Sequence, residues 1–79
     1  VQLKLYGADF SNAKLTNVLF KTDGRYYQAD LRRANFQNAF LKDIDFVNVS
    51  LFETNFEGAI FCNVLMDYEV KNTGNESCM

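Results

Sequence analysis

Large apolar residues recur at every fifth position along the chain. The series runs Leu5, Phe10, Leu15, Phe20, then, after one additional residue, Tyr26, Leu31, Phe36, Leu41, Phe46, Leu51, Phe56, Phe61 and Met66. An α-helix returns to the same face every 3.6 residues and a flat strand every two, so a period of five fits neither element. A chain that turns a corner once in five residues closes a square after four units, and stacked squares share one apolar interior. The pattern therefore predicts a solenoid with these residues as its core centres.

The positions before the centres add a second regularity. Two residues before most centres lies a small or β-branched residue, such as Ala8, Ala34 or Val49. The segments 8–12, 29–33 and 34–38 read ADFSN, ADLRR and ANFQN, and they resemble the A(D/N)LXX unit of pentapeptide-repeat proteins. This resemblance implies an all-β fold, a right-handed quadrilateral β-helix with about twenty residues per coil and about three to four coils. It implies little about function, because members of that family bind varied partners.

The repeat register divides the chain into two predicted parts. Residues 1–68 are expected to form the β-helix, with a one-residue bulge near Asp23-Gly24, a dipeptide typical of turns. Residues 69–79 leave the register and are predicted to cap the last coil, because an uncovered coil exposes its apolar rim and its strand edges. Tyr68 and Val70 are expected to fold over Met66. No equivalent cap precedes Leu3, so the N-terminal rim is expected to be either a dimerisation edge or the point at which a longer parent was cut.

A single extra residue sets the expected stacking between coils. Equivalent residues of the first two coils are then 21 apart and those of later coils 20 apart, which predicts the columns Leu5/Tyr26/Phe46/Met66, Phe10/Leu31/Leu51, Leu15/Phe36/Phe56 and Phe20/Leu41/Phe61. A middle side chain such as Phe36 should be covered from both sides.

The same register predicts an apolar patch on the outer surface. It places Leu19, Phe40 and Ile60 above one another, with Leu65 around the next corner and Tyr6, Tyr27 and Val47 as a second stripe. Contiguous exposed apolar residues often mark a contact surface, whereas single ones carry no meaning. We therefore take Leu19, Phe40, Ile60, Leu65, Tyr6 and Tyr27 as candidate partner-binding residues. The alternative is that corner geometry tucks these side chains under neighbouring turns. Phe52 is expected to stand alone and without a role.

Charge is distributed unevenly along the chain. Residues 1–42 carry seven Lys/Arg and three Asp, a net charge of +4, whereas residues 43–79 carry one Lys and seven Asp/Glu, a net charge of −6. Sequence order is axial order in a solenoid, so the N-terminal end should be positive and the C-terminal end negative. Such a gradient favours head-to-tail approach, or docking of the first coils on an acidic partner. The alternative is an ordinary solvated surface.

Several function classes lack support in the sequence. The chain has no His, no nucleophile elbow, no Gly-rich phosphate loop and no metal-ligand spacing, so we expect no enzyme, no cofactor and no small-molecule substrate. Asp43 and Asp45 are close in sequence but suggest no acid-base pair. A net charge of −2 disfavours nucleic-acid binding. No apolar run approaches the roughly 20 residues that span a bilayer, so direct membrane insertion is not expected.

The two cysteines bear on the compartment. A bridge between Cys62, expected to point outward, and Cys78 in the tail would close a loop of about 15 residues and stabilise the fold by about 3 kcal/mol. In the cytosol both would stay reduced. We favour a cytoplasmic protein of a bacterium or cyanobacterium, with an extracytoplasmic or luminal location if the two cysteines are bridged.

Two function classes follow from these patterns. The first is a non-catalytic binding or scaffolding module that acts through a solenoid face, on a protein partner or on a second copy. The second is a luminal or extracytoplasmic receptor-like domain of a larger membrane protein, similar in kind to the pentapeptide-like loop of synaptic-vesicle transporters. Some pentapeptide-repeat proteins are thought to mimic DNA and inhibit type II topoisomerases. That role is a minor alternative here, because a mimic needs a long acidic rod and Arg32 and Arg33 interrupt the relevant surface.

Overall fold

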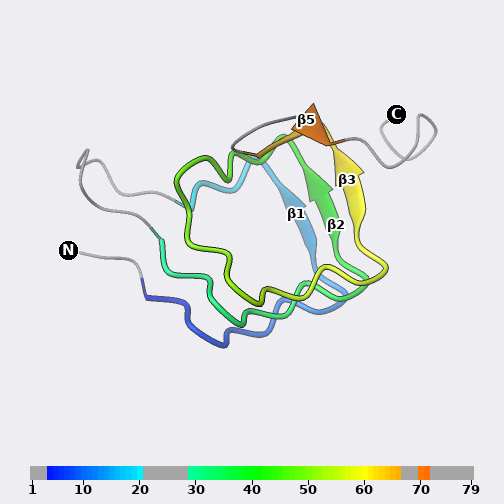
Figure 1. The fold of residues 1–79 in the computed structure, drawn as a ribbon. Helices are drawn as coiled ribbons and strands as arrows, with labels where there is room; N and C mark the ends of the chain where they lie inside the picture. The colour runs from blue at the N-terminus through cyan, green and yellow to red at the C-terminus, as the bar shows by residue number, and fades with distance from the viewer. Residues whose placement is uncertain (1–3, 21–28, 67–69, 72–79) are drawn as a thin grey trace.

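Short strands and tight turns make up the fold. A computed structural model describes residues 4–20, 29–66 and 70–71, and these contain strands, turns and no helix. Strands β1 (Lys14–Thr16), β2 (Phe40–Lys42) and β3 (Ile60–Cys62) form a parallel sheet in the order β1-β2-β3. Strands β4 (Val64–Leu65) and β5 (Val70–Lys71) pair antiparallel (Figure 1). The prediction of an all-β protein is confirmed.

The chain makes three passes that lie side by side. We name them rung 1 (residues 4–20), rung 2 (residues 29–48) and rung 3 (residues 49–66). Parallel bridges join the rungs through Lys4, Asp30 and Ser50, and again through Asp9, Asn35 and Asn55. Figure 1 shows the three passes in blue, green and yellow along a common outline. Successive rungs are therefore hydrogen-bonded to one another around their perimeter and not only within the sheet.

The register between rungs differs from the predicted one. Rung 1 pairs with rung 2 at an offset of 26 residues, as in Leu15 with Leu41, and rung 2 pairs with rung 3 at an offset of 20, as in Leu41 with Phe61. The observed columns are Leu5/Leu31/Leu51, Phe10/Phe36/Phe56, Leu15/Leu41/Phe61 and Phe20/Phe46/Met66. The predicted columns, which shifted rung 1 by one face, are wrong. Tyr26 and the bulge predicted near residues 23–24 lie outside the described residues.

Like side chains stack on like in the observed register, which is the physical reason for the correction. The rings of Phe10 and Phe36 lie 4.8 Å apart with an interplanar angle of 11°, and those of Phe36 and Phe56 lie 5.2 Å apart at 16°. Phe20 stacks on Phe46 at 5.5 Å. Neighbouring columns meet edge to face, as Phe36 and Phe46 do at 5.9 Å and 77°. Both geometries suit the ring quadrupole. An offset of 21 would have placed Leu against Phe.

Burial is deepest in the middle rung. Phe36, Leu31 and Leu41 are fully buried, whereas the centres Leu5, Phe10, Leu15, Leu51, Phe56, Phe61 and Met66 of the outer rungs are only partly buried. The difference arises because rung 2 has a neighbour on both sides. The inward positions two residues before the centres are also filled by small side chains, among them Ala34. Thr54 occupies one of them, and its hydroxyl donates a hydrogen bond of 2.8 Å to the Leu31 carbonyl oxygen, so it is not left unsatisfied.

The corners use left-handed backbone at a fixed position. Every described residue that lies two after a centre has φ between 53° and 73°; these are Gly7, Asn12, Asn17, Arg33, Asn38, Asp43, Asn48, Glu53, Gly58 and Asn63. Gly tolerates this region without cost, and Asn and Asp tolerate it better than other residues. A Cβ on Gly58 would also collide with the Asn38 side chain. The Asn, Asp and Gly content of these positions is thus a requirement of the turn.

Truncating the central ring of the phenylalanine column should be costly. We expect Phe36→Ala to lower the free energy of unfolding by about 3–5 kcal/mol, because both faces of the ring lose their stacked partners and a buried cavity remains. Phe56→Ala, in a partly buried outer rung, should cost clearly less. Chemical denaturation followed by circular dichroism measures both values, and equal losses would contradict the difference in burial between the rungs.

A substitution at one corner should stabilise the protein. Glu53 has φ 59° and forms an exposed ion pair of 2.9 Å with Arg33. Because such a pair is worth at most about 1 kcal/mol, and left-handed backbone costs an ordinary residue about 1–2 kcal/mol, Glu53→Asn should raise the free energy of unfolding by about 0.5 kcal/mol. Glu57→Asn makes the same chemical change away from a left-handed position and should give no gain in the same denaturation experiment. A loss of stability in Glu53→Asn would refute the backbone argument.

Candidate functional site

The predicted apolar patch is divided among different faces of the structure. Phe40 does pair with Ile60, but its partner in rung 1 is Lys14, whose Nζ lies 5.7 Å from the centre of the Phe40 ring. Leu19 pairs instead with Asp45, which pairs in turn with Leu65. The prediction that Leu19, Phe40 and Ile60 form one column is therefore wrong, because it used an offset of 21 where the structure has 26.

Exposure also differs between the members of that patch. Phe40 and Ile60 are half-buried, whereas Leu19 and Leu65 are exposed, with the carboxylate-bearing Asp45 between them. Tyr27 lies outside the described residues. What remains of the prediction is a pair of half-buried side chains on one face and two separated leucines on the next.

A different column joins aromatic and arginine side chains on the outer surface. Tyr6, Arg32 and Phe52 follow the offsets of 26 and 20, and hydrogen bonds next to them hold the rungs together, from Gly7 N–H to the Arg32 carbonyl and from Arg33 N–H to the Phe52 carbonyl, both 2.9 Å. Tyr6 is 55% exposed and Phe52 70% exposed. The Arg32 Cζ lies 5.4 Å from the centre of the Tyr6 ring, a cation-π distance. We name these three residues the aromatic-arginine column.

This column corrects two sequence-based expectations. Tyr6 was expected to stack with Tyr27 and Val47, and Phe52 to stand alone, yet the structure places both in line with Arg32. The signal was available: each of the three residues directly follows a leucine centre, and aligning the leucines Leu5, Leu31 and Leu51 aligns the column.

Arg32 is held in place by a nearly buried carboxylate. Its Nε and Nη2 donate hydrogen bonds of 2.8 Å to the two oxygens of Asp30, and its backbone N–H donates to Oδ1 at 3.1 Å. Asp30 is only 7% exposed. The hydrogen bond from the Arg32 side chain lowers the pKa of Asp30 to about 2, and the same bond raises the pKa of Arg32. This bidentate geometry fixes the direction of the guanidinium group.

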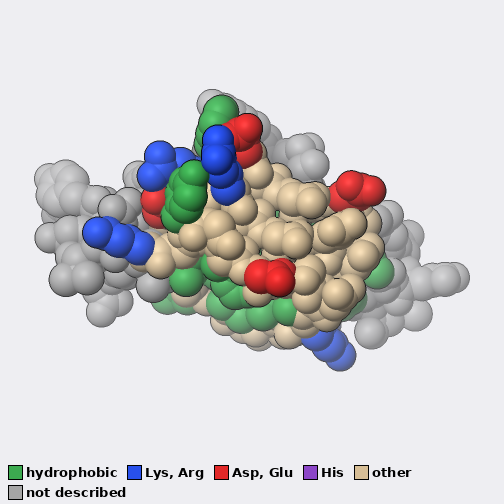
Figure 2. All heavy atoms as spheres, turned by 90° about the horizontal axis from the view of Figure 1, so that it is seen from below, with side chains coloured by type: hydrophobic (Ala, Val, Ile, Leu, Met, Phe, Trp, Pro, Cys, Tyr) green, Lys and Arg blue, Asp and Glu red, His purple; other side chains and the backbone are tan. Residues whose placement is uncertain are grey.

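Charged residues surround the column without burying it. The Arg33 Nε donates a hydrogen bond of 2.9 Å to Glu53, and both side chains remain exposed, so the pair adds little stability. Figure 2 shows hydrophobic side chains standing among Lys, Arg, Asp and Glu side chains on one part of the visible face. The surface is therefore mixed in character, with charges of both signs beside aromatic rings.

Other polar side chains serve the turns. Asp9, Asn35, Asp45 and Asn55 each accept a hydrogen bond of 2.8–2.9 Å from the backbone N–H two residues later. The bonds from the Ser11 side chain and backbone lower the pKa of Asp9. These are the local bonds that Asp and Asn form in turns. The position before each centre is thus explained by local structure.

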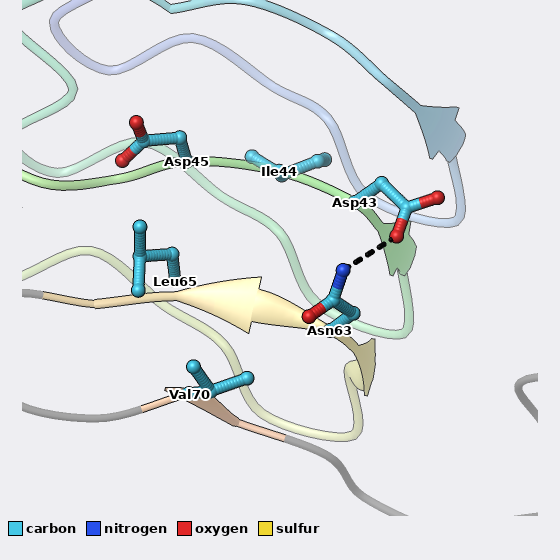
Figure 3. Close-up of a pocket in the computed structure, with 6 residues that line it drawn as sticks. All are labelled: Asp43, Ile44, Asp45, Asn63, Leu65 and Val70. Carbon is cyan, nitrogen blue, oxygen red and sulfur yellow. Dashed lines mark hydrogen bonds between the residues drawn. The ribbon is translucent and has the colours of Figure 1, made fainter.

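A shallow hollow of about 300 Å³ lies beside β4 and β5. It is lined by Asp43, Ile44, Asp45, Asn63, Leu65 and Val70 (Figure 3). Asp43 accepts a hydrogen bond of 2.8 Å from Asn63, and the carboxylates of Asp43 and Asp45 lie on either side of Ile44 and point apart. Within residues 4–20, 29–66 and 70–71 no three potential metal ligands gather. The two carboxylates are thus not arranged as an acid-base pair.

The cysteine at the end of β3 is oxidised. Cys62 is disulfide-bonded and 1% exposed, although its alternation with Phe61 along the strand puts it on the outer side of the sheet. The expectation of an outward direction is compatible with that alternation, but the side chain is covered. Cys78, the other cysteine of the chain, lies outside the described residues. Among the described residues there is also no helix long and apolar enough to cross a membrane.

The ion pair beneath the column should make stability depend on pH. Because the pKa of Asp30 is about 2 in the folded protein and its ordinary value is 3.8, the ionised form stabilises the fold fully above about pH 4, and this contribution is lost as the pH falls toward 2. Asp30→Asn should remove that part of the acid sensitivity. Urea midpoints of both proteins from about pH 5 to 2 measure it.

A matched control separates the ion pair from the turn. Asp9→Asn leaves the turn bond to Ser11 in place and removes no ion pair, so it should reduce the acid sensitivity less than Asp30→Asn does. Equal effects of the two substitutions would show that the Arg32 contact adds nothing.

Comparison with known proteins identifies the repeats. The family model for pentapeptide repeats matches residues 29–67, in eight copies. Neither the curated proteins nor the solved structures include a match to this chain. The matched segment coincides with rungs 2 and 3, in which the spacing of 20 residues is unbroken. The chain therefore carries pentapeptide repeats, and residues 29–67 belong to the pentapeptide-repeat family.

Proposed function

We propose that the chain is a non-catalytic module that binds a protein partner through the aromatic-arginine column. In this proposal the three rungs are coils of a right-handed quadrilateral β-helix, which serves as a rigid support. The observation that carries the proposal is the position of Arg32, fixed by Asp30 and lying over Tyr6, with the 70% exposed Phe52 in the same column.

The composition of the column is that of a binding hot spot. Tyr and Arg are enriched among the residues that dominate interface energies, and aromatic residues are enriched in interfaces. Holding a side chain in its bound conformation beforehand also reduces the entropy cost of association. The Asp30 contact supplies that order for Arg32, and rung pairing supplies it for the backbone on which Tyr6 and Phe52 stand.

The contacts of Arg32 suggest the chemistry of the partner. Two of its five side-chain N–H groups donate to Asp30, which leaves three for an acceptor on another molecule. Because Asp30 balances the charge, a backbone carbonyl or an amide suits this site as well as a carboxylate does. We expect the partner to present such an acceptor beside an apolar side chain that covers Phe52. No catalytic role, cofactor, small-molecule substrate or nucleic acid forms part of this proposal.

The oxidised cysteine supports a place for this binding outside the cytosol. Disulfides persist mainly in secreted, luminal and periplasmic proteins, and Cys62 is disulfide-bonded. This observation favours the second class from the sequence, an extracytoplasmic or luminal receptor-like domain, over a cytoplasmic scaffold. In either compartment the binding surface is the same.

Photo-crosslinking from the column tests the proposal. A photoreactive phenylalanine analogue at position 52 should trap a partner in cells that produce the protein, and mass spectrometry identifies the adduct. Arg32→Ala should reduce the yield about tenfold, the loss expected for a hot-spot residue worth about 1.4 kcal/mol. Arg32→Lys should also fail to restore the yield, since an ammonium group cannot make the bidentate contact to Asp30.

The control uses an exposed apolar residue on another face. Leu19 is 64% exposed, similar to Phe52, and the same analogue placed there should trap much less of the partner. Leu19→Ser should likewise leave crosslinking from position 52 unchanged. Equal trapping from positions 19 and 52, or an unchanged yield in Arg32→Ala, would refute the column as the binding surface.

A further inference from the structure

The outer side of rung 1 is an edge without a neighbouring rung among the described residues. β1 is an outermost strand in the order β1-β2-β3. The inward side chains Leu5, Phe10, Leu15 and Val18 of rung 1 are only partly buried, whereas their equivalents Leu31, Phe36, Leu41 and Ile44 in rung 2 are at most 1% exposed. Figure 2 shows hydrophobic side chains gathered along one edge of the molecule. One further rung would complete the burial of this end.

The backbone hydrogen-bond pattern shows which groups rung 1 offers on that edge. In rungs 2 and 3 the residue before a centre donates its N–H to the preceding rung, as Asn35 does to Ala8 and Phe40 to Ala13, both at 2.8 Å. The equivalent residues of rung 1 are Asp9 and Lys14, so their N–H groups point away from rung 2.

The acceptors on this edge follow from the same comparison. In rung 2 the carbonyls of Arg32 and Gln37 face rung 1, where they accept from Gly7 and Asn12 at 2.9 Å. Their equivalents in rung 1 are the carbonyls of Tyr6 and Ser11, which therefore face outward. Rung 1 thus presents alternating donors and acceptors, as an edge strand does when it is ready to pair.

We propose that a second copy of this chain occupies the edge, rung 1 against rung 1, in a two-fold symmetric dimer whose axis passes beside Phe10. A two-fold axis reverses the chain direction, so the rungs pair antiparallel. The N–H of Asp9 then meets the carbonyl of Ser11 in the second copy, and the N–H of Lys14 meets the carbonyl of Tyr6. The two Phe10 rings stack and extend the ladder that already runs through Phe36 and Phe56.

Charge complementarity favours a second copy in this orientation. The charged side chains of rung 1 are Lys4, Asp9 and Lys14. The axis beside Phe10 places Lys14 next to Tyr6 of the second copy and Lys4 next to Thr16, so that no like charges meet. A lysine beside an aromatic ring is already present within the chain, where Lys14 lies over Phe40.

The two ends of the molecule differ, which favours a closed pair over an open fibre. At the other end β5 pairs antiparallel with β4, so that end does not repeat the edge of rung 1. A two-fold interface uses one surface twice and closes, whereas head-to-tail contacts continue indefinitely. This interface lies at the end of the stack and is separate from the side-chain surface of the aromatic-arginine column.

Analytical ultracentrifugation of matched variants tests the dimer. The wild-type chain should reach twice its mass of 9.1 kDa as the concentration rises into the high micromolar range. Phe10→Ser should weaken association at least about tenfold, because the stacked pair at the axis is lost. Phe56→Ser is the control: it also removes one stacked partner of Phe36, but at the opposite end, and it should leave association unchanged.

A second variant tests the edge without altering the core. Lys14→Pro removes the outward N–H that the internal bonds do not use and blocks strand pairing, so it should also give a monomer. Circular dichroism checks that both variants fold. Phe52→Ser should still dimerise, which separates this inference from the proposed function.

Hydrogen exchange distinguishes a second copy from other occupants of the edge. The amides of Asp9 and Lys14 should be protected in the dimer and become unprotected on dilution. A monomer at every concentration, or protection that does not depend on concentration, would overturn the proposal, the latter by showing that part of the same chain covers the edge. Masses that grow beyond the dimer would overturn it in favour of head-to-tail stacking.

Discussion

Hydrogen bonding between successive rungs is the interaction on which the rest of this structure depends. Each rung is only a series of short extended segments joined by turns, and none has a core of its own. Bonds such as Asn35 N–H to the Ala8 carbonyl set the rungs in register all around the perimeter. Once the register is set, the centres of one rung lie over those of the next, and apolar burial and main-chain pairing reinforce each other. The middle rung is fully buried for this reason.

The turns are the condition for that pairing. A corner every five residues requires left-handed backbone two residues after each centre, and it uses a side-chain acceptor one residue before the centre, as in Asp9 and Asn35. These two demands account for much of the Asn, Asp and Gly in the chain. They also explain why Asp and Asn at such positions are poor indicators of a binding site, since local backbone bonds already engage them. Arg33 and Glu53 occupy left-handed corners without this advantage.

The same register organises the outer surface. Residues that directly follow the leucine centres form a vertical line, and there Arg32 lies over Tyr6 with Phe52 beyond it. Asp30 couples this line to the turn beneath, because one carboxylate accepts both a backbone N–H and the guanidinium group. A rigid backbone that presents aromatic and arginine side chains at rung spacing is well suited to binding other proteins. Its end edges, by contrast, offer backbone groups, as in the pairing of whole strands.

The sequence by itself determined the kind of fold, because a period of five in large apolar residues is incompatible with a helix or a flat strand and repeats through both described halves of the chain. It also determined which residues face inward, since Leu31, Phe36 and Leu41 are all centres of the pattern and all fully buried. The offset between the first two rungs was decided only by the tertiary structure. A pattern in sequence counts residues along the chain, and it cannot tell whether residues between Phe20 and Ala29 complete a rung or lie outside one. Pairing across space settles that question: Leu15 bonds beside Leu41, 26 residues on, and this alone brings Tyr6, Arg32 and Phe52 together while separating Leu19 from Phe40.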